Sequence, residues 1–412
     1  VQPRPHRAKV SRTPISWGIP APVSVLCRVF GLWAGGMTTW AALAGTGDPL
    51  MNWAPTWIWI IWWIGLSLCV AALGNLWPLF DPWRTLYDGL FWTLQALGLK
   101  PSSWATRWPS GLGMWPAVGL LLLWSWLEVI YALPSSPQRI GLAVVAWTVV
   151  NIVGMLGFGR DSWQRHADVF AIYFDQLGRI APLQLKHSKE LIKPQDHEPQ
   201  PSQGSNPGRV GFVIAMLASV LFDGLHGSPA WLIFQETGQR WLPLNWDVNG
   251  YWIGALGLIC VWLVLGLAYM AACWITARWM RPVRTSEIAW AFTPTLVPIA
   301  VGYLIAHNFS GLIVQGQNLI SLASDPLGRQ WDLFGTAGRP MDIGLIDAAT
   351  QWYVAWWAIV IGHAVSIWAG HRQALAMTQD PGQATRVGLP LTVLMVAYTA
   401  LSLLAISEPL LS

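Results

Sequence analysis

The stretch from Val301 to Gln317 holds polar side chains that could do chemistry inside an otherwise apolar run. On a helix that turns about 100° per residue, Tyr303, His307, Ser310 and Gln317 fall on one face. Polar or ionisable groups inside a membrane are costly, so they usually face the interior of a bundle or a wet cavity. The stretch therefore predicts a functional site on a membrane helix. Its candidate substrate-binding residues are Tyr303, Asn308, Ser310, Gln315 and Gln317.

The composition places the whole chain in the membrane. Of its 412 residues, 54% are hydrophobic and 11% are charged, whereas about a quarter of a soluble domain is charged. The four cysteines lie in apolar runs without a Cys-x-x-Cys spacing, which indicates buried thiols rather than disulfides or a zinc site. We expect an all-α, polytopic helical bundle that is surrounded by the lipid bilayer and has no nucleic acid as a partner.

Nine apolar segments have roughly the length that crosses a bilayer. They lie near residues 22–43, 54–76, 112–132, 139–158, 210–234, 248–277, 288–312, 345–370 and 387–407. With the N-terminus inside, 19 of the 24 lysines and arginines fall in the inner loops, as the positive-inside rule requires. The sequence therefore predicts about nine transmembrane helices, with the N-terminus inside and the C-terminus outside.

The segments between these spans organise the chain. Residues 81–99 and 160–186 are too polar to span and predict two interfacial amphipathic helices. Residues 187–209 are polar and Pro-rich, which predicts a flexible cytoplasmic linker. This linker separates an N-terminal membrane half (1–186) from a C-terminal half (210–412), and we expect the two to form one structural domain. Four tryptophans at the start of the second span are expected to be interfacial anchors: Trp57, Trp59, Trp62 and Trp63.

The predicted directions of the spans bring further candidates to the level of His307. Asp223 and His226 share one helical face at the end of the fifth span, which reads as a half-span interrupted by Gly and Pro. Glu128 lies near the outer end of the third span and Asp347 near the start of the eighth. Glu128, Asp223, His226, His307 and Asp347 are therefore expected to converge in one outward-facing pocket. His363 is expected in the inner half of the membrane, outside this pocket, because the eighth span starts outside and rises about 1.5 Å per residue.

Two histidines with two or three carboxylates are a ligand set suited to a divalent metal ion such as Zn²⁺, Mn²⁺ or Fe²⁺. A metal held by His307, Asp223, His226, Glu128 and Asp347 would activate water and polarise a phosphoryl or carbonyl oxygen. We name His307, Asp223 and Glu128 as the candidate catalytic residues. Two alternatives stay open: these groups form hydrogen bonds between helices, or they line a pathway for a substrate or an ion.

Four blocks of the sequence carry a family resemblance. They are DPWR (Asp81–Arg84), FDGL (Phe222–Leu225), AHNFSGLIVQGQ (Ala306–Gln317) and SDPLG…DLFGTAG (Ser324–Gly338). Their order resembles a group of bacterial multi-pass membrane proteins identified as fenitrothion hydrolase. The resemblance implies an organophosphate hydrolase of the bacterial inner (plasma) membrane. Such an enzyme would cleave an apolar aryl phosphorothioate triester to a phenol and a dialkyl thiophosphate.

Two other functions remain possible from the sequence. In one, the chain is a transporter or permease, with the fifth span and the His307 face lining its pathway. The sequence shows no inverted repeat, which many transporters have. In the other, the chain is an accessory subunit of a larger membrane complex, and His307 or His363 binds a haem. A bis-histidine haem site would need both ligands at one depth.

Overall fold

The computed structural model describes residues 15–186, 207–241, 250–378 and 380–407. This part of the chain is helical except for one pair of parallel four-residue strands, β1 (Ile15–Gly18) and β2 (Leu183–Lys186). The predicted helical class is therefore confirmed, with this small strand pair as an addition. Most of the predicted linker, residues 187–206, lies outside the described residues. Its last three positions belong to a helix that begins at Pro207.

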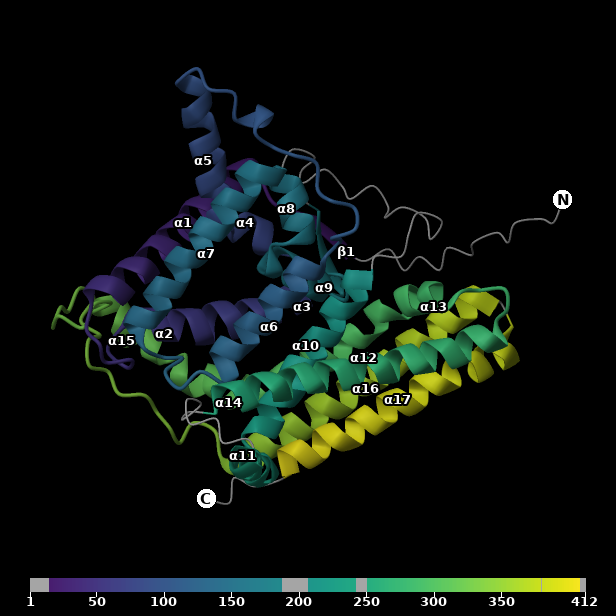
Figure 1. Ribbon diagram of the computed structural model, residues 1–412. Coiled ribbons are helices and arrows are strands. Elements are labelled where there is room, and N and C mark those ends of the chain that lie inside the picture. Colours follow the sequence, from purple (N-terminus) through teal and green to yellow (C-terminus); the bar gives the residue numbers. More distant parts are fainter. Residues whose placement is uncertain (1–14, 187–206, 242–249, 379, 408–412) are drawn as a thin grey trace.

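The helices fall into two groups along the chain, most of the first lying toward the upper left of Figure 1 and most of the second toward the lower right. The longer helices of the first group are α1 (Ala21–Ala44), α5 (Pro82–Ala96), α6 (Trp115–Val129) and α7 (Pro137–Phe158). Its shorter elements are α2 (Trp53–Pro55), the π-helix η1 (Thr56–Gly65), α3 (Leu66–Leu73), α4 (Trp77–Phe80), η2 (Pro101–Ser103), α8 (Arg160–His166) and α9 (Val169–Gly178). The second group comprises α10 (Pro207–His226), α11 (Pro229–Trp241), α12 (Tyr251–Trp279), α13 (Thr285–Phe292), η3 (Thr293–Leu296), α14 (Val297–Gln315), α15 (Asn318–Ser324), α16 (Ala348–Thr378) and α17 (Pro381–Ser407).

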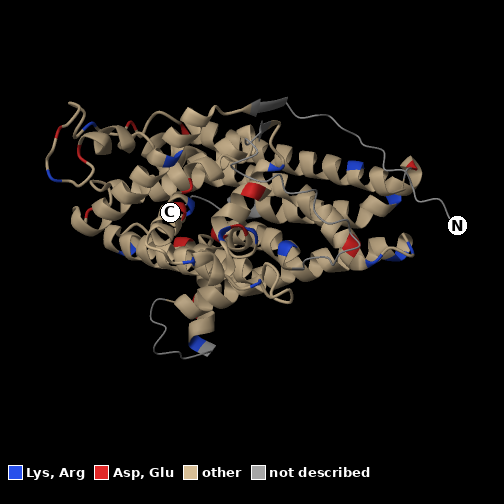
Figure 2. Cartoon of the chain, turned by 90° about the horizontal axis from the view of Figure 1, so that it is seen from above, with Lys and Arg blue, Asp and Glu red and all other residues tan. Residues whose placement is uncertain are grey.

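Seven helical stretches in the described residues are long and apolar enough to cross a membrane. They are Trp53–Leu73, Pro137–Phe158, Gly208–His226, Tyr251–Trp279, Thr285–Gln315, Ala348–Thr378 and Pro381–Leu403. The other two predicted spans form helices α1 and α6, but they are not among these seven, so the number nine stays a prediction. Large apolar side chains project outward from α12, including Leu263, Val264 and Leu267. Figure 2 shows that charged residues are sparse along most of the helices. Lipid is the medium that covers such a surface, and the chain is a multi-pass membrane protein.

Close backbone contact fixes the helices around His307. A Cβ built on Gly302 of α14 would lie 2.5 Å from the carbonyl oxygen of Ala358 in α16. A Cβ on Gly362 would lie 2.8 Å from the carbonyl oxygen of Pro298. Small residues at such crossings let membrane helices approach closely. The paired positions show that α14 and α16 run antiparallel, which agrees with the alternation of the predicted spans.

The fifth predicted span differs from the expected interrupted half-span. Helix α10 continues through Asp223 to His226, and the chain breaks only afterwards, before α11 begins at Pro229. Gly224 therefore lies within the helix instead of ending it. The expectation of a half-span was wrong because a single glycine weakens a helix by only about 1 kcal/mol, which packing of the apolar face can offset.

Two expectations about the membrane interface were also wrong. Within the predicted interfacial segment 160–186, α9 is buried, with Phe170 and Phe174 both at most 1% exposed. Its apolar residues lie on all sides, which is typical of a buried helix. The tryptophans of η1 also turn inward: the Trp63 ring stacks on Tyr173, with centroids 4.7 Å apart, and Trp62 contacts Phe170. The π-helical winding of η1 changes the direction of successive side chains, which hydropathy does not predict.

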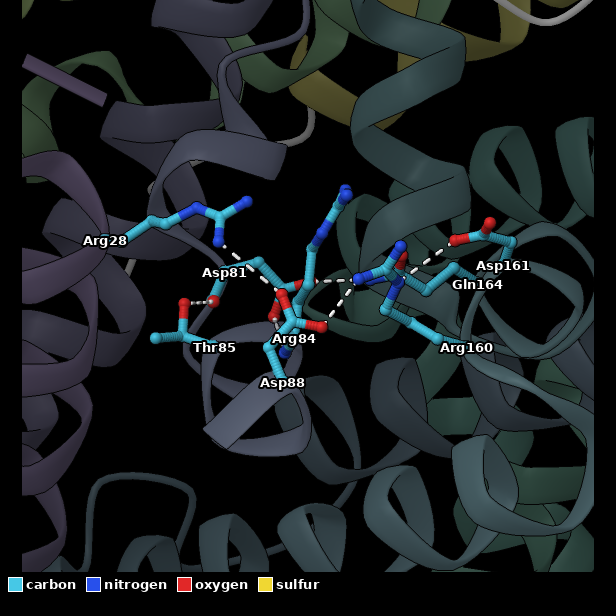
Figure 3. Close-up of polar contacts among 8 residues, drawn as sticks. All are labelled: Arg28, Asp81, Arg84, Thr85, Asp88, Arg160, Asp161 and Gln164. Carbon is cyan, nitrogen blue, oxygen red and sulfur yellow. Dashed lines mark hydrogen bonds and ion pairs between the residues drawn. The ribbon is translucent and has the colours of Figure 1, made fainter. Parts of the chain in front are cut away.

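A charged cluster joins α1, α5 and α8 (Figure 3). Asp88 accepts from Arg160 at 2.6 Å and pairs more loosely with Arg28 at 3.5 Å. Asp81 begins α5 by accepting from the backbone N–H of Arg84 and also accepts from Gln164. Burial raises the pKa of Asp81 to about 6, although Arg84 partly offsets this. The cluster holds the connection after α4 against the start of α8.

Asp168, which caps α9, makes the stability of this region depend on pH. Its Oδ1 accepts from the N–H groups of Phe170 and Ala171. Burial and then the charge of Asp81 raise the pKa of Asp168 to about 8. The pKa is higher in the folded than in the unfolded chain, so the folded state binds the extra proton between about pH 4 and pH 8. This carboxyl group therefore destabilises the fold progressively as pH rises through that range.

We expect Asp168→Asn to flatten this loss of stability. Asparagine caps a helix about as well as aspartate and cannot ionise. The variant should match the wild type in melting temperature near pH 5 and exceed it near pH 8.5, which a thermal unfolding series in detergent measures. Asp161→Asn, at an exposed position, serves as the control. If the melting temperatures of wild type and Asp168→Asn changed equally with pH, the proposed effect of the Asp168 carboxyl group would be contradicted.

Candidate functional site

The structure brings Asp223 of α10 and His307 of α14 together. His307 Nδ1 lies 3.7 Å from Asp223 Oδ2, at ion-pair distance. The Asp223 side chain is 48% exposed and that of His307 is 20% exposed, so the pair is reached from one side. His307 Nε2 has no hydrogen-bond partner among the described residues. This Nε2 atom is buried, so only a water molecule or ligand that enters the bundle can reach it, while Nδ1 faces the carboxylate.

A line of aromatic and imidazole rings leads inward from this pair. The Tyr303 ring stacks on His307, with centroids 5.2 Å apart and planes inclined by 12°. Tyr398 of α17 contacts the Tyr303 ring at 6.2 Å and the His363 ring at 5.9 Å. Tyr303, Tyr398 and His363 are all at most 5% exposed. His363 is thus more buried than His307, and aromatic contacts connect the two. Its place in the inner half of the membrane stays a prediction.

Several polar atoms along this line have no hydrogen-bond partner within the described residues. They are Tyr303 Oη, His307 Nε2, His363 Nε2 and Ser402 Oγ. His363 Nδ1 is held by the carbonyl oxygen of Ile359 at 2.8 Å, and Tyr398 donates to the carbonyl oxygen of Leu217 at 2.9 Å. Because buried polar groups are usually satisfied, this cluster is a candidate position for water, a proton or a polar ligand.

The other three proposed ligands have different partners. Glu128 accepts from the indole N–H of Trp63 at 2.8 Å and also lies within electrostatic reach of Asp223. The His226 ring packs against Trp231 at 5.9 Å. Asp347 is exposed and accepts from the N–H of Thr350, capping α16. Asp223 nevertheless interacts electrostatically with Glu128, His226 and His307, so four of the five expected groups lie near one another. Asp347 does not join them, because it caps α16 at an exposed position.

No group of three or more His, Cys, Asp or Glu side chains that could hold a metal ion occurs in the described part of the chain. Asp223 and His307 supply two adjacent donors, whereas a catalytic zinc site usually has three protein ligands. The observed donor set does not fit the expected Zn, Mn or Fe site, so we derive no reaction step through a metal. The roles of His307, Asp223 and Glu128 in catalysis stay predictions.

The expected substrate-binding residues separate into two sets. Tyr303 is buried against His307, and Asn308 donates to the carbonyl oxygen of Leu304 in its own helix. Ser310 is half-buried and Gln315 is exposed. Gln317 lies beyond the end of α14 and exchanges hydrogen bonds with the backbone of Asp342 at 3.1 and 3.2 Å. Gln317 also donates to the carbonyl oxygen of Ile313 one turn earlier, so its amide is occupied by the backbone. Its place on the predicted polar face stays a prediction.

A separate cavity of about 850 Å³ lies among α1, η1, α3, α6 and α7. Its wall is almost entirely apolar and aromatic, with Trp59, Trp62 and Trp124 among the largest contributors. Arg139 is the one charged side chain in this wall. The cavity is open on one side rather than enclosed, so the medium around the helices can enter it.

Tyr398 and Ser402 are site residues that sequence reasoning missed. Both are polar residues in the apolar run of the last span, so the rule that identified Tyr303 could have found them. Their proximity to α14 could not be predicted from hydropathy.

The class of the protein follows from the fold and the buried polar line: a multi-pass helical membrane protein with an ionisable site inside its bundle. No family model, curated protein or solved structure matches this chain.

Proposed function

We propose that this protein is a hydrolase of the bacterial inner membrane that acts on apolar esters, organophosphate triesters being the class that the family resemblance implies. The observation that carries the proposal is the Asp223–His307 pair with a free Nε2. Such a pair is suited to general acid–base catalysis, which contributes about 10²–10⁴-fold to a rate. An apolar triester would concentrate in the bilayer and reach the half-exposed side of the pair.

The reaction needs one proton acceptor and one proton donor. His307 Nε2 takes a proton from water, and the water oxygen forms a bond to phosphorus. The bond between phosphorus and the aryl oxygen breaks, and the leaving aryloxide takes the proton from the imidazolium to give a phenol. The dialkyl thiophosphate acid then loses its proton to solvent. Asp223 orients Nδ1–H and stabilises the imidazolium, as carboxylates do beside catalytic histidines.

The test is direct. The purified protein is reconstituted in vesicles with an aryl dialkyl phosphorothioate, and release of the phenol is followed by absorbance. We expect turnover above the rate of empty vesicles. Absence of turnover with this triester and with a matched carboxylic ester would reject the hydrolase.

We further propose nine spans with an inner N-terminus and an outer C-terminus. The bias of basic residues toward one set of loops supports this orientation. A reporter fused after Ser412 should lie outside, and one inserted within residues 187–206 should lie inside. Reporter activities on the same side would contradict the nine-span arrangement.

A proton pathway is the second candidate function, because the line from Asp223 through His307, Tyr303 and Tyr398 to His363 crosses part of the bundle. Chains of Asp, His and Tyr serve as proton relays in membrane proteins. We expect protein-containing vesicles with a pH-sensitive dye to take up protons faster than empty vesicles when a pH gradient is imposed. His363→Ala should remove most of this flux and His371→Ala, at an exposed position of α16, should not. Equal proton flux in both variants would exclude the pathway.

No observation favours the third alternative, a haem-holding subunit.

A further inference from the structure

The cavity among α1, η1, α3, α6 and α7 offers a site that the catalytic proposal does not use. We propose that it binds one phospholipid, with an acyl chain inside the cavity and the lipid phosphate at Arg139. The inference depends only on the membrane location of the chain and is independent of the proposed hydrolase.

The dimensions of the cavity match one acyl chain. Its wall follows α7 from Ile140 to Val150, a length of about 15 Å at roughly 1.5 Å per residue. The hydrocarbon core of a bilayer is about 30 Å thick, so the chains of one leaflet extend over about half of that. The volume of about 850 Å³ lies within the range of sites for small ligands.

The chemistry of the wall also favours a lipid chain over water. Trp57, Trp83 and Trp147 line the cavity beside Leu and Val side chains. Large apolar cavities stay dry because water finds too few polar partners there. The outer face of α7 is itself apolar, with Leu142 and Val149 more than half exposed. A chain can therefore pass from the surrounding bilayer into the cavity without crossing a polar surface.

Arg139 provides the position for the headgroup. It follows the first two residues of α7 and stands at the end of the cavity, next to Ile140. Its side chain is exposed, and it makes no ion pair with an acidic residue of the described chain. Arginine binds phosphate through paired N–H donors. A phosphate at Arg139 would leave the attached chain directed along α7.

The site can be tested by filling it. Ala143 lies in the cavity wall and Val149 lies on the outer face of the same helix. Wild type, Ala143→Trp and Val149→Trp are reconstituted in vesicles of phosphatidylcholine with phosphatidylglycerol that carries a photoactivatable group in its acyl chain. After illumination, mass spectrometry locates the adducts. We expect a dominant adduct on the cavity wall, at least tenfold weaker in Ala143→Trp and unchanged in Val149→Trp.

Further variants keep the test independent of one substitution. Ala146→Trp, also in the wall, should act like Ala143→Trp if the latter does not fold. Arg139→Gln should lower phospholipid retained through detergent exchange by about three- to tenfold. The proposal would be overturned if the adducts were spread evenly over the exposed faces of α7 and α12. It would also be overturned if the adduct on the cavity wall persisted in both cavity-filling variants.

Discussion

Replacing His307 by alanine is expected to lower hydrolysis of an apolar phosphotriester by about 10²–10⁴-fold while the protein still inserts and purifies. The variant removes Nε2, the atom proposed to take the proton from water, and Nδ1, which faces Asp223 at 3.7 Å. Asp223→Asn should lower turnover as well, because the amide cannot stabilise the imidazolium by charge. Since the two groups act as one unit, the double variant should be no worse than His307→Ala alone.

The controls separate chemistry from packing. If the pair served only to hold α10 against α14, His307→Ala would cost about 1–2 kcal/mol of helix association and Asp223→Asn would be mild. Initial rates of phenol release, normalised to folded protein, distinguish the two outcomes. His371→Ala should retain the wild-type rate. Full turnover in His307→Ala would remove the catalytic role of the pair.

Gly302→Val is expected to prevent stable assembly of the helical bundle. A Cβ at this position would lie 2.5 Å from the carbonyl oxygen of Ala358 and 3.3 Å from Gly362 Cα. These are backbone atoms, so no side-chain rotation can relieve the overlap, and α14 must move away from α16. We expect a loss of about 3 kcal/mol or more, at or above the upper end for overpacked cores. The displacement would also separate His307 from Asp223.

A matched control lies on the same helix. Gly311 of α14 has open space where a Cβ would be placed, so Gly311→Val changes helix propensity by a similar amount without the overlap. The thermal melting temperature and the fraction of monodisperse protein in detergent should fall sharply for Gly302→Val and change little for Gly311→Val. Similar behaviour of the two variants would show that the α14–α16 crossing does not depend on Gly302.

The sequence by itself determined the class of this protein and indicated that Asp223 and His307, which lie 3.7 Å apart, would be close. Hydropathy is a sum over neighbouring residues, so it identified the helices that cross the membrane without any knowledge of their packing. His307 and Asp223 stood out for the same local reason, because ionisable groups are rare in apolar runs. Alternation of the spans then placed both at one end of the bundle.

Only the tertiary structure decided which of these residues meet. Glu128 and His226 lie near enough to Asp223 to interact with it electrostatically, but their direct contacts are with Trp63 and Trp231. Asp347 instead caps the start of α16. The direction of a side chain depends on the rotation of its helix and on the crossing angle, and both are set by close contacts such as Gly302 against Ala358. The π-helical turn of η1, the burial of α9 and the contact of Tyr398 with His363 depend on the same long-range packing. No local pattern in the sequence carries that information, because it arises from residues far apart along the chain.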